Sequence, residues 1–224
     1  MRHTVETLGE DALLLRFGDA IDVTTNDRVH ALARRIERVR PPWLRDLVPA
    51  YASLALFVDG DAFACDVDPL IEAGRWLQQQ GFPDGDSSIA GQLVETPVHY
   101  GGEYGPDLSA VAAHAGLDER EVIARHCAVE YRVAMLGFAP GFPYLLGLDP
   151  ILAMPRLDTP RTRVAAGSVG IGGAQTGIYP REGPGGWHVI GRTTRPLFDP
   201  AREPPALLAP GDRVRFVAST ESPP

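Results

Sequence analysis

The sequence predicts an α+β fold in two lobes: a split-βαβ, ferredoxin-like lobe, then a lobe built mainly of short strands. Strand-like and helix-like periods alternate over the first hundred residues in the order β-α-β-β-α-β. After about residue 128, helical periodicity disappears and short strand candidates are separated by glycine and proline, as in closed or sandwiched β domains. The expected parts are an N-terminal lobe over 1–90, a β lobe over 91–218 and a disordered tail over 219–224.

The first predicted strand is ALLLRFG (12–18), and a helix follows it. Apolar residues then recur at helical spacing, with Thr24 or Thr25 as the expected cap and Pro41-Pro42 as the stop. These apolar residues are Val29, Leu32, Ala33, Ile36 and Val39.

Two further strands, DLVPA (46–50) and SLALFVD (53–59), precede a second helix in the N-terminal lobe. Asp68-Pro69 supplies its cap and first-turn proline, and Gly81 ends it. The loop 81–88 separates this helix from a strand over 92–100, which we expect to complete the split-βαβ unit.

The β lobe is expected to open with two short helices. One spans Asp107 to Gly116, and the other begins at a capping box formed by Asp118 and Glu121 and ends near Cys127. The strand candidates that follow are VEYRVAML (129–136), TRVAAGSVGIGG (162–173), GIYP (177–180), GWHVIGRT (186–193) and DRVRFVA (212–218).

Composition excludes several classes of function. The chain has 224 residues and a net charge of −8, which disfavours nucleic acids and anionic membranes as partners. All 21 basic residues are arginine, so the chain offers neither a Schiff-base lysine nor a Walker A phosphate loop. The two cysteines fit no zinc or disulfide pattern, and no long apolar run is present. We expect a cytoplasmic protein without a metal site.

The stretch GFAPGFPYLLGLDP (137–150) is apolar and rich in proline. Prolines at this spacing suit neither a helix nor a central strand. We expect a stiff loop, which loses little entropy on binding, at the rim of a groove. A loop that plugs the core is the alternative.

The glycine-rich segment GSVGIGGAQTGIYP (167–180) matches no nucleotide-binding fingerprint, because Gln175 stands at the third glycine position and no helix follows. Ser168 resembles the serine of a nucleophile elbow, but Ala166 replaces the first glycine. Glycines at β-bulges and barrel corners are the structural explanation. Gln175 and Tyr179 beside bare backbone favour a ligand or partner chain that approaches closely.

Another loop-rich stretch, 181–200, places Trp187 and His188 after a Pro-Gly-Gly turn, with Arg192 further along a strand. Tryptophan and arginine dominate binding hot spots, although a tryptophan in this position also suits a core. His99 and His114 show no partner spacing and receive no role.

Three blocks, GFAPGFPYL, TPRTRVAAGSVGIGGAQTGIYP and PGGWHVIGRTTRPLFD, resemble the family of the 5-oxoprolinase B subunit. This family is also labelled allophanate hydrolase subunit 1 and includes the histidine-kinase inhibitor KipI. The resemblance extends from the ALLLRFG strand to GDRVRFV. It implies a cyclophilin-like barrel for the second lobe and a non-autonomous component of an enzyme complex, which opens 5-oxo-L-proline with subunits A and C. ATP is used by that complex and is not necessarily bound by this chain.

The motif residues of the family, carried over by position, predict a groove for a small amide substrate or a partner chain. They are Phe138, Pro140, Phe142, Tyr144, Arg161, Gly167, Ser168, Gln175, Tyr179, Gly186, Trp187 and Arg192. Within this set, Arg161 or Arg192 would hold a carboxylate or phosphate. Gln175 and Tyr179 would orient the substrate, and backbone N–H groups near Gly167 and Ser168 would stabilise negative charge. No residue is assigned as the catalyst.

Two other functions remain open. One is a KipI-like inhibitor of histidine-kinase autophosphorylation, which would use the groove only for docking. The other is a carboxyltransferase-like component of urea metabolism.

Overall fold

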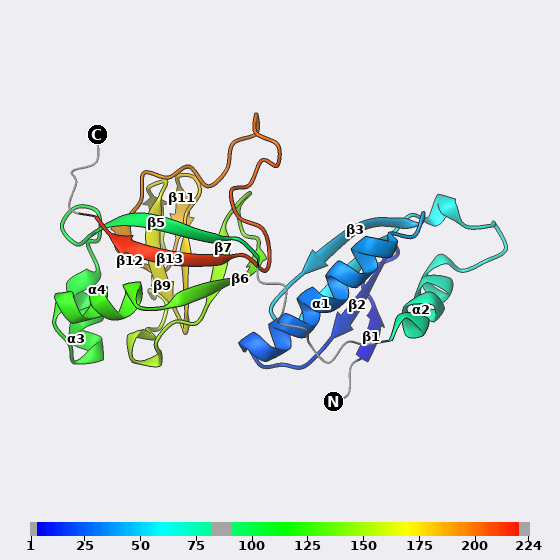
Figure 1. Cartoon of the computed structure of the whole chain (residues 1–224), viewed down its shortest axis with the longest axis horizontal. Helices are drawn as coiled ribbons and strands as arrows, with labels where there is room; N and C mark the ends of the chain where they lie inside the picture. The colour runs from blue at the N-terminus through cyan, green and yellow to red at the C-terminus, as the bar shows by residue number, and fades with distance from the viewer. Residues whose placement is uncertain (1–3, 82–90, 220–224) are drawn as a thin grey trace. The chain divides into compact units, whose positions relative to one another are not determined.

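The computed structural model describes residues 4–81 and 91–219, and the chain divides into two compact units over residues 1–89 and 90–224 (Figure 1). Residues 82–88 of the expected loop and residues 220–224 of the expected tail lie outside the described residues. Among the helices of the described parts, none has the length and apolar character required to cross a bilayer. The α+β prediction is confirmed.

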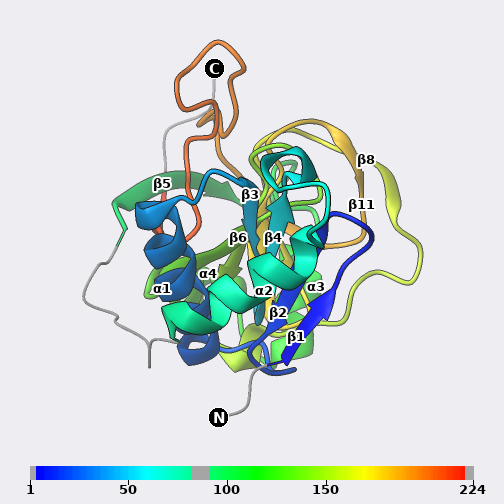
Figure 2. The ribbon, with the colours of Figure 1, turned by 90° about the vertical axis from the view of Figure 1, so that its right-hand side faces the viewer.

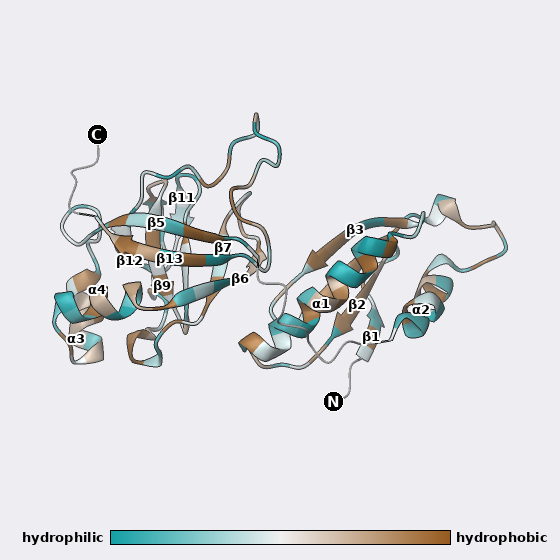
Figure 3. Cartoon of the chain, in the orientation of Figure 1, coloured by the Kyte–Doolittle hydropathy of each residue, from teal (hydrophilic) through white to brown (hydrophobic). Residues whose placement is uncertain are grey.

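The first unit is a four-stranded antiparallel sheet in the order β1-β2-β4-β3, with two helices packed on one face (Figure 2). Its elements are β1 (Thr4–Thr7), β2 (Ala12–Arg16), α1 (Val23–Val39), β3 (Leu44–Pro49), β4 (Ser53–Val58), the 3-10 turn η1 (Gly60–Ala62) and α2 (Pro69–Gln80). Leu15, Leu54 and Leu56 from the strands pack against Leu32 and Leu77 from the helices. Apolar and polar positions are interleaved along α1, as an amphipathic helix requires (Figure 3).

The strand over 92–100 is real. The expected β-α-β-β-α-β order wrongly counted it with the first sheet, whereas the expected lobe boundary at residue 90 counted it with the β lobe. It is β5 (Leu93–Tyr100) and belongs to the barrel of the second unit. The position beside β2 is taken instead by β1, a short and polar strand from the start of the chain. Periodicity identifies a strand but does not identify its hydrogen-bonding partner.

Local signals placed the helix ends with one exception. Asp68 and Gly81 delimit α2 as predicted. Helix α1 is capped by Asp22 and not by Thr24 or Thr25. The Asp22 carboxylate accepts from the Thr25 backbone N–H at 2.9 Å and from its hydroxyl at 2.7 Å, so it satisfies an amide that the first turn leaves unpaired.

The second unit is a closed barrel of seven strands in the order β10-β7-β6-β13-β5-β12-β9. Strands β5 and β13 pair in parallel, and the other neighbours pair antiparallel. A separate ribbon pairs β8 with β11. The elements of this unit are β5, α3 (Leu108–Ala115), α4 (Glu119–Cys127), β6 (Glu130–Leu136), β7 (Pro143–Leu146), the 3-10 turn η2 (Pro150–Leu152), β8 (Arg161–Val164), β9 (Ser168–Gly172), β10 (Gln175–Ile178), β11 (Gly183–Gly185), β12 (His188–Arg192) and β13 (Arg213–Ala218).

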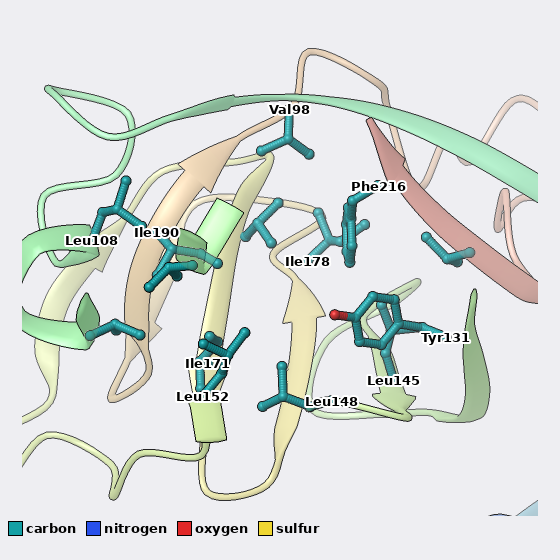
Figure 4. Packing of buried hydrophobic residues seen from close by; sticks show 14 of the residues in the cluster. Val98, Leu108, Tyr131, Leu145, Leu148, Leu152, Ile171, Ile178, Ile190 and Phe216 are labelled. Carbon is teal, nitrogen blue, oxygen red and sulfur yellow. The ribbon is translucent and has the colours of Figure 1, made fainter. Parts of the chain in front are cut away.

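Side chains fill the barrel, so its interior is a core and not a channel (Figure 4). Fully buried Tyr131, Leu145 and Phe216 belong to this core, and Leu108 of α3 and Val122 of α4 extend it to the helices. The sites available for binding therefore lie on the outside of the barrel.

Two stretches expected to be irregular contain strands. The proline-rich segment includes β7, with Pro143 as its first residue, a position where a strand tolerates proline. The expected turn at 184–186 includes most of β11, whose Gly183 and Gly185 pair with β8. At the start of α4, the Asp118 carboxylate accepts the Glu121 N–H, as a capping box requires. The Glu121 side chain, however, pairs with Arg125, so the reciprocal half of the expected capping box is not formed.

Candidate functional site

The loop between β6 and β7 begins with a strained turn at Phe138. The Ala139 N–H donates to the Gly137 carbonyl at 2.7 Å, and Phe138 between them has φ 64°. A γ-turn with a positive φ at its central residue is rare and strained, above all for a residue with a bulky side chain. The turn projects the Phe138 ring outward, and the residue is 64% exposed.

A second turn follows directly. The Phe142 N–H donates to the Ala139 carbonyl at 2.9 Å, with Pro140 second and Gly141 third at φ 78°. Proline followed by a glycine with positive φ is the signature of a type II turn. This turn aligns the chain to enter β7 and brings Phe142 under Phe138, their ring centroids 5.4 Å apart.

Five aromatic residues from separate segments form a pocket outside the barrel, which we call the aromatic pocket: Phe138, Phe142, Tyr144, Tyr179 and Trp187. Phe142 meets Tyr179 edge-on at 5.2 Å and Trp187 at 5.6 Å, and Tyr144 meets Trp187 at 5.8 Å. Edge-to-face contacts at these spacings are favourable for aromatic rings. The cavity measures about 160 Å³, and Gly186 also lines it.

Glycine is required where the rings meet the backbone. A Cβ at Gly172 would lie 2.5 to 2.7 Å from atoms of the Trp187 indole, and one at Gly185 would overlap the Tyr179 hydroxyl. Trp187 is only 5% exposed, so it supports the pocket from below, and Phe138 is its accessible member. Burial raises the pKa of Tyr144 and of Tyr179, so both hydroxyls remain protonated at neutral pH.

Arg161 binds a carboxylate of the protein itself. Its Nη2 donates to Asp107 Oδ1 at 2.6 Å, and Asp107 Oδ2 accepts the Val189 N–H at 2.7 Å. Asp107 is the expected cap of α3, yet its side chain makes no capping hydrogen bond there. The Asp107–Arg161 pair instead ties the β8–β11 ribbon to β12, beside the aromatic pocket.

Arg192 lies in a different cavity, the basic pocket, which measures about 430 Å³. His99, Glu103, Tyr104, Gly167, Arg192 and Arg195 are among its lining residues. Pro180 lines it too and directly follows Tyr179 of the aromatic pocket. The predicted groove residues therefore fall into two neighbouring hollows.

The remaining predicted residues take other positions. Pro140 is exposed in the turn beside Phe138, while Ser168 and Gln175 are 4% and 9% exposed on β9 and β10. Within the described residues, no histidine hydrogen-bonds the Ser168 hydroxyl, and β9 leads to a strand where a nucleophile elbow needs a helix.

The backbone N–H groups proposed to stabilise negative charge are occupied. The Gly167 N–H donates to the Tyr179 carbonyl at 2.7 Å, and the Ser168 N–H donates to the Ala165 carbonyl at 3.2 Å. Both of these donors serve the fold, and the role expected for backbone N–H groups near Gly167 and Ser168 stays a prediction.

His126, which has no role in the sequence analysis, lies at the centre of a buried hydrogen-bond chain. The Thr176 hydroxyl donates to the Gly170 carbonyl at 3.0 Å, so it must accept from His126 Nε2 at 3.1 Å. His126 Nδ1 then accepts a hydrogen bond from the Tyr100 hydroxyl at 2.7 Å. The Tyr100 oxygen in turn accepts a hydrogen bond from the Cys127 thiol at 3.5 Å. Burial lowers the pKa of His126 to about 3, so the ring is neutral with its proton on Nε2.

Sequence reasoning assigned no role in a site to His99, Tyr104 or Arg195, which line the basic pocket. His99 and Tyr104 come from the end of β5 and the turn after it, far from the glycine-rich blocks. Only the pairing of β5 with β12, which sets His99 opposite Arg192, brings these segments together. For Arg195, the Arg-Thr-Thr-Arg spacing from 192 to 195 was an available signal.

The architecture described above, a four-stranded α/β unit joined to a barrel, is that of a known class. The chain belongs to the family of the carboxyltransferase domain, subdomain C and D, which matches residues 3–208. Over 99% of this chain and 95% of the relative, it is 42% identical to the B subunit of 5-oxoprolinase from Bacillus subtilis. The resemblance drawn from the three sequence blocks is thus confirmed.

Solved structures support the same grouping. The protein TTHA0988 is 42% identical with a TM-score of 0.79, over 95% of this chain and 41% of that longer one. This chain thus spans about two fifths of TTHA0988. Kluyveromyces lactis urea amidolyase aligns with a TM-score of 0.76 at 22% identity, over 97% of this chain and 15% of the other, a likeness of fold.

Proposed function

We propose that the chain is the B subunit of a cytoplasmic, ATP-dependent 5-oxoprolinase, acting with subunits A and C to convert 5-oxo-L-proline to L-glutamate. The observation that carries the proposal is the 42% identity to a 5-oxoprolinase B subunit along almost the whole length of both chains. Resonance stabilises the lactam of the substrate against water. In this proposal ATP phosphorylates the lactam oxygen and leaves as ADP, and two water molecules then open the activated ring and release glutamate and phosphate.

The residues of the chain support a role that depends on its partners. The sequence holds no lysine and no Walker A loop. The candidate nucleophile Ser168 is buried, and no histidine of the described residues hydrogen-bonds its hydroxyl. In the proposal another component of the complex therefore holds ATP, and this chain contributes binding surfaces.

The aromatic pocket supplies the surface that we assign to the C subunit. Phe138 keeps a left-handed φ of 64° and exposes 64% of its surface, two features that the isolated unit does not need. Strain of this kind costs about 1–3 kcal/mol and concentrates at functional sites. A partner that covers the ring would offset that cost. In TTHA0988, a region similar to this chain makes up 41% of a longer polypeptide. That arrangement supports the proposal that this chain works beside a permanent partner.

The carboxyltransferase hypothesis has weaker support. It rests on the family description and on a fold likeness to urea amidolyase at 22% identity, confined to 15% of that protein. The docking role of a kinase inhibitor has the exposed Phe138 in its favour, but that residue serves the contact with the C subunit equally well.

Glutamate release tests the proposal. Each component alone and every mixture are supplied with ATP and 5-oxo-L-proline, and parallel mixtures receive urea as the alternative substrate. We expect glutamate only when subunits A, B and C are together. Turnover by this chain by itself, or consumption of urea in place of 5-oxoproline, would contradict the proposal.

A Phe138→Asn variant tests the partner surface. Asparagine accepts a left-handed φ, so the free energy of unfolding should change by less than about 1 kcal/mol. Binding to the C subunit should weaken by about tenfold or more, as for an exposed aromatic anchor. The control is Ile71→Asn, on α2, at a residue 54% exposed. Equal affinity of the C subunit for both variants and the parent would exclude Phe138 as the anchor.

A further inference from the structure

The basic pocket is preformed by contacts between two loops. The Thr193 N–H donates to the Gly167 carbonyl at 2.9 Å, and a Cβ at Gly167 would clash with the Thr193 carbonyl. Thr193 is itself buried, and its hydroxyl accepts the Arg195 N–H at 3.2 Å. The segments that carry the pocket's cations are therefore held together before any ligand arrives, which lowers the entropic cost of binding.

Arg192 is held in an orientation that leaves its outer nitrogens available. Its Nε donates to the Ala166 carbonyl at 2.8 Å, and within the described residues no further hydrogen bond of its guanidinium is found. Arg195 uses one Nη group on the Glu95 carbonyl. A guanidinium anchored through Nε presents paired Nη donors, the arrangement that grips a planar carboxylate.

The charges of the lining favour a ligand with a single negative charge. Arg192 and Arg195 bring two positive charges and Glu103 one negative charge, which leaves one net positive charge. A monocarboxylate neutralises it. A nucleoside triphosphate carries several negative charges and would place some of them against Glu103 without a counterion.

The other residues that line the basic pocket include polar and aromatic groups. The rings of His99 and Tyr104 lie 5.8 Å apart at an interplanar angle of 52°, and the Glu103 carboxylate belongs to the same turn. Carboxylate and imidazole groups accept hydrogen bonds from an amide N–H. A cavity of about 430 Å³ has room for a small ring.

We propose that the basic pocket binds a small monocarboxylic acid that also carries an N–H donor, with its carboxylate on Arg192 and its N–H toward Glu103 and His99. Cyclic amides of amino acids have this chemistry. Naming 5-oxo-L-proline as the ligand rests on the proposed function, whereas the monocarboxylate class rests on the pocket alone.

Calorimetric titration of the full chain tests the ligand class with three probes: 5-oxo-L-proline, 2-pyrrolidinone and inorganic phosphate. Pyrrolidinone keeps the lactam and lacks the carboxylate, so its affinity should be lower by about tenfold or more. Equal affinities for the two lactams would overturn the proposal. Displacement of 5-oxoproline by equimolar phosphate would also overturn it, since the site would then be a phosphate site.

Variants locate the binding. Arg192→Gln should weaken 5-oxoproline binding by about tenfold or more, and Arg195→Gln should weaken it by a few-fold. Arg120→Gln, at an exposed position on α4, should match the parent. Thermal melting checks each fold, and Arg195→Gln carries the test if Arg192→Gln is unstable. Unchanged binding in both pocket variants refutes the assignment.

The mixture of subunits A, B and C separates this inference from the proposed function. In an active mixture, Arg192→Gln should raise KM for 5-oxoproline more than it lowers kcat. If the mixture is active and both pocket variants keep the parental KM, the assignment of the basic pocket is rejected and the proposed function stands. An inactive parental mixture rejects the function, while the titration of the chain still decides the pocket. Absence of both binding and a KM effect rejects the pocket.

Discussion

Acidification should destabilise the barrel through one buried group, His126. Burial lowers its pKa from 6.5 to about 3 in the folded chain. Below pH 6.5 the unfolded chain takes up a proton on this imidazole, and the folded chain does not until the pH reaches about 3. The stability that depends on the neutral ring is therefore complete above pH 6.5 and is lost as the pH falls toward 3. One pKa unit corresponds to slightly more than 1 kcal/mol, so lowering the pH to about 4.5 should cost about 3 kcal/mol.

Urea unfolding across this pH range measures the effect, followed by NMR signals of barrel residues so that the two units are not confused. His126→Gln should lack this loss of about 3 kcal/mol, even though the variant begins less stable. His114→Gln, at an exposed position on α3, should keep the parental pH dependence. Nitrogen-15 spectra of the ring should show the Nε2–H tautomer at about pH 5. A ring that titrates near pH 6, or an unaltered pH slope in His126→Gln, would falsify the reasoning.

Two further predictions concern the framework of the aromatic pocket. Gly172→Ala should lower the unfolding free energy by about 1–3 kcal/mol in urea titrations, because the new methyl group meets the Trp187 indole. Gly183→Ala, where a Cβ meets nothing within 4 Å, should stay within about 0.5 kcal/mol, and equal losses would count against the packing argument. Asp107→Asn should cost about 1–3 kcal/mol, since the Arg161 charge loses its partner. Adding Arg161→Gln should then cost less than it does alone, and strict additivity of the two losses would show that the pair is not coupled.

Features with short-range causes could be predicted from the sequence. Helix α2 is bounded by Asp68-Pro69 and Gly81, which act on their own turns, so its limits followed from local chemistry. Strand β5 was recognised by its alternation, but its partner β13 lies more than a hundred residues away. No local signal specifies such a pairing, and the strand was placed in the wrong sheet.

The candidate site shows the same division. Phe138, Phe142, Tyr144, Tyr179 and Trp187 were all expected in one groove, and the structure brings them into one pocket. The continuity of that groove with Arg192 stays a prediction. Trp187 lines the aromatic pocket and Arg192 the basic pocket, and β12, which begins directly after Trp187, carries a register shift between Val189 and Gly191. A bulge redirects side chains in a way that sequence spacing alone does not reveal.

The parallel pairing of β5 with β13 has a consequence for synthesis of the chain. These are the first and last strands of the second unit, in register from Leu93 beside Arg213 to Val98 beside Ala218. On a ribosome, β5 emerges long before the strand that must flank it, and its edge stays unpaired while the intervening residues are made. Exposed strand edges invite association between chains. The barrel closes only after β13 has been translated, so the edge of β5 is open to other chains until residues 213–218 emerge.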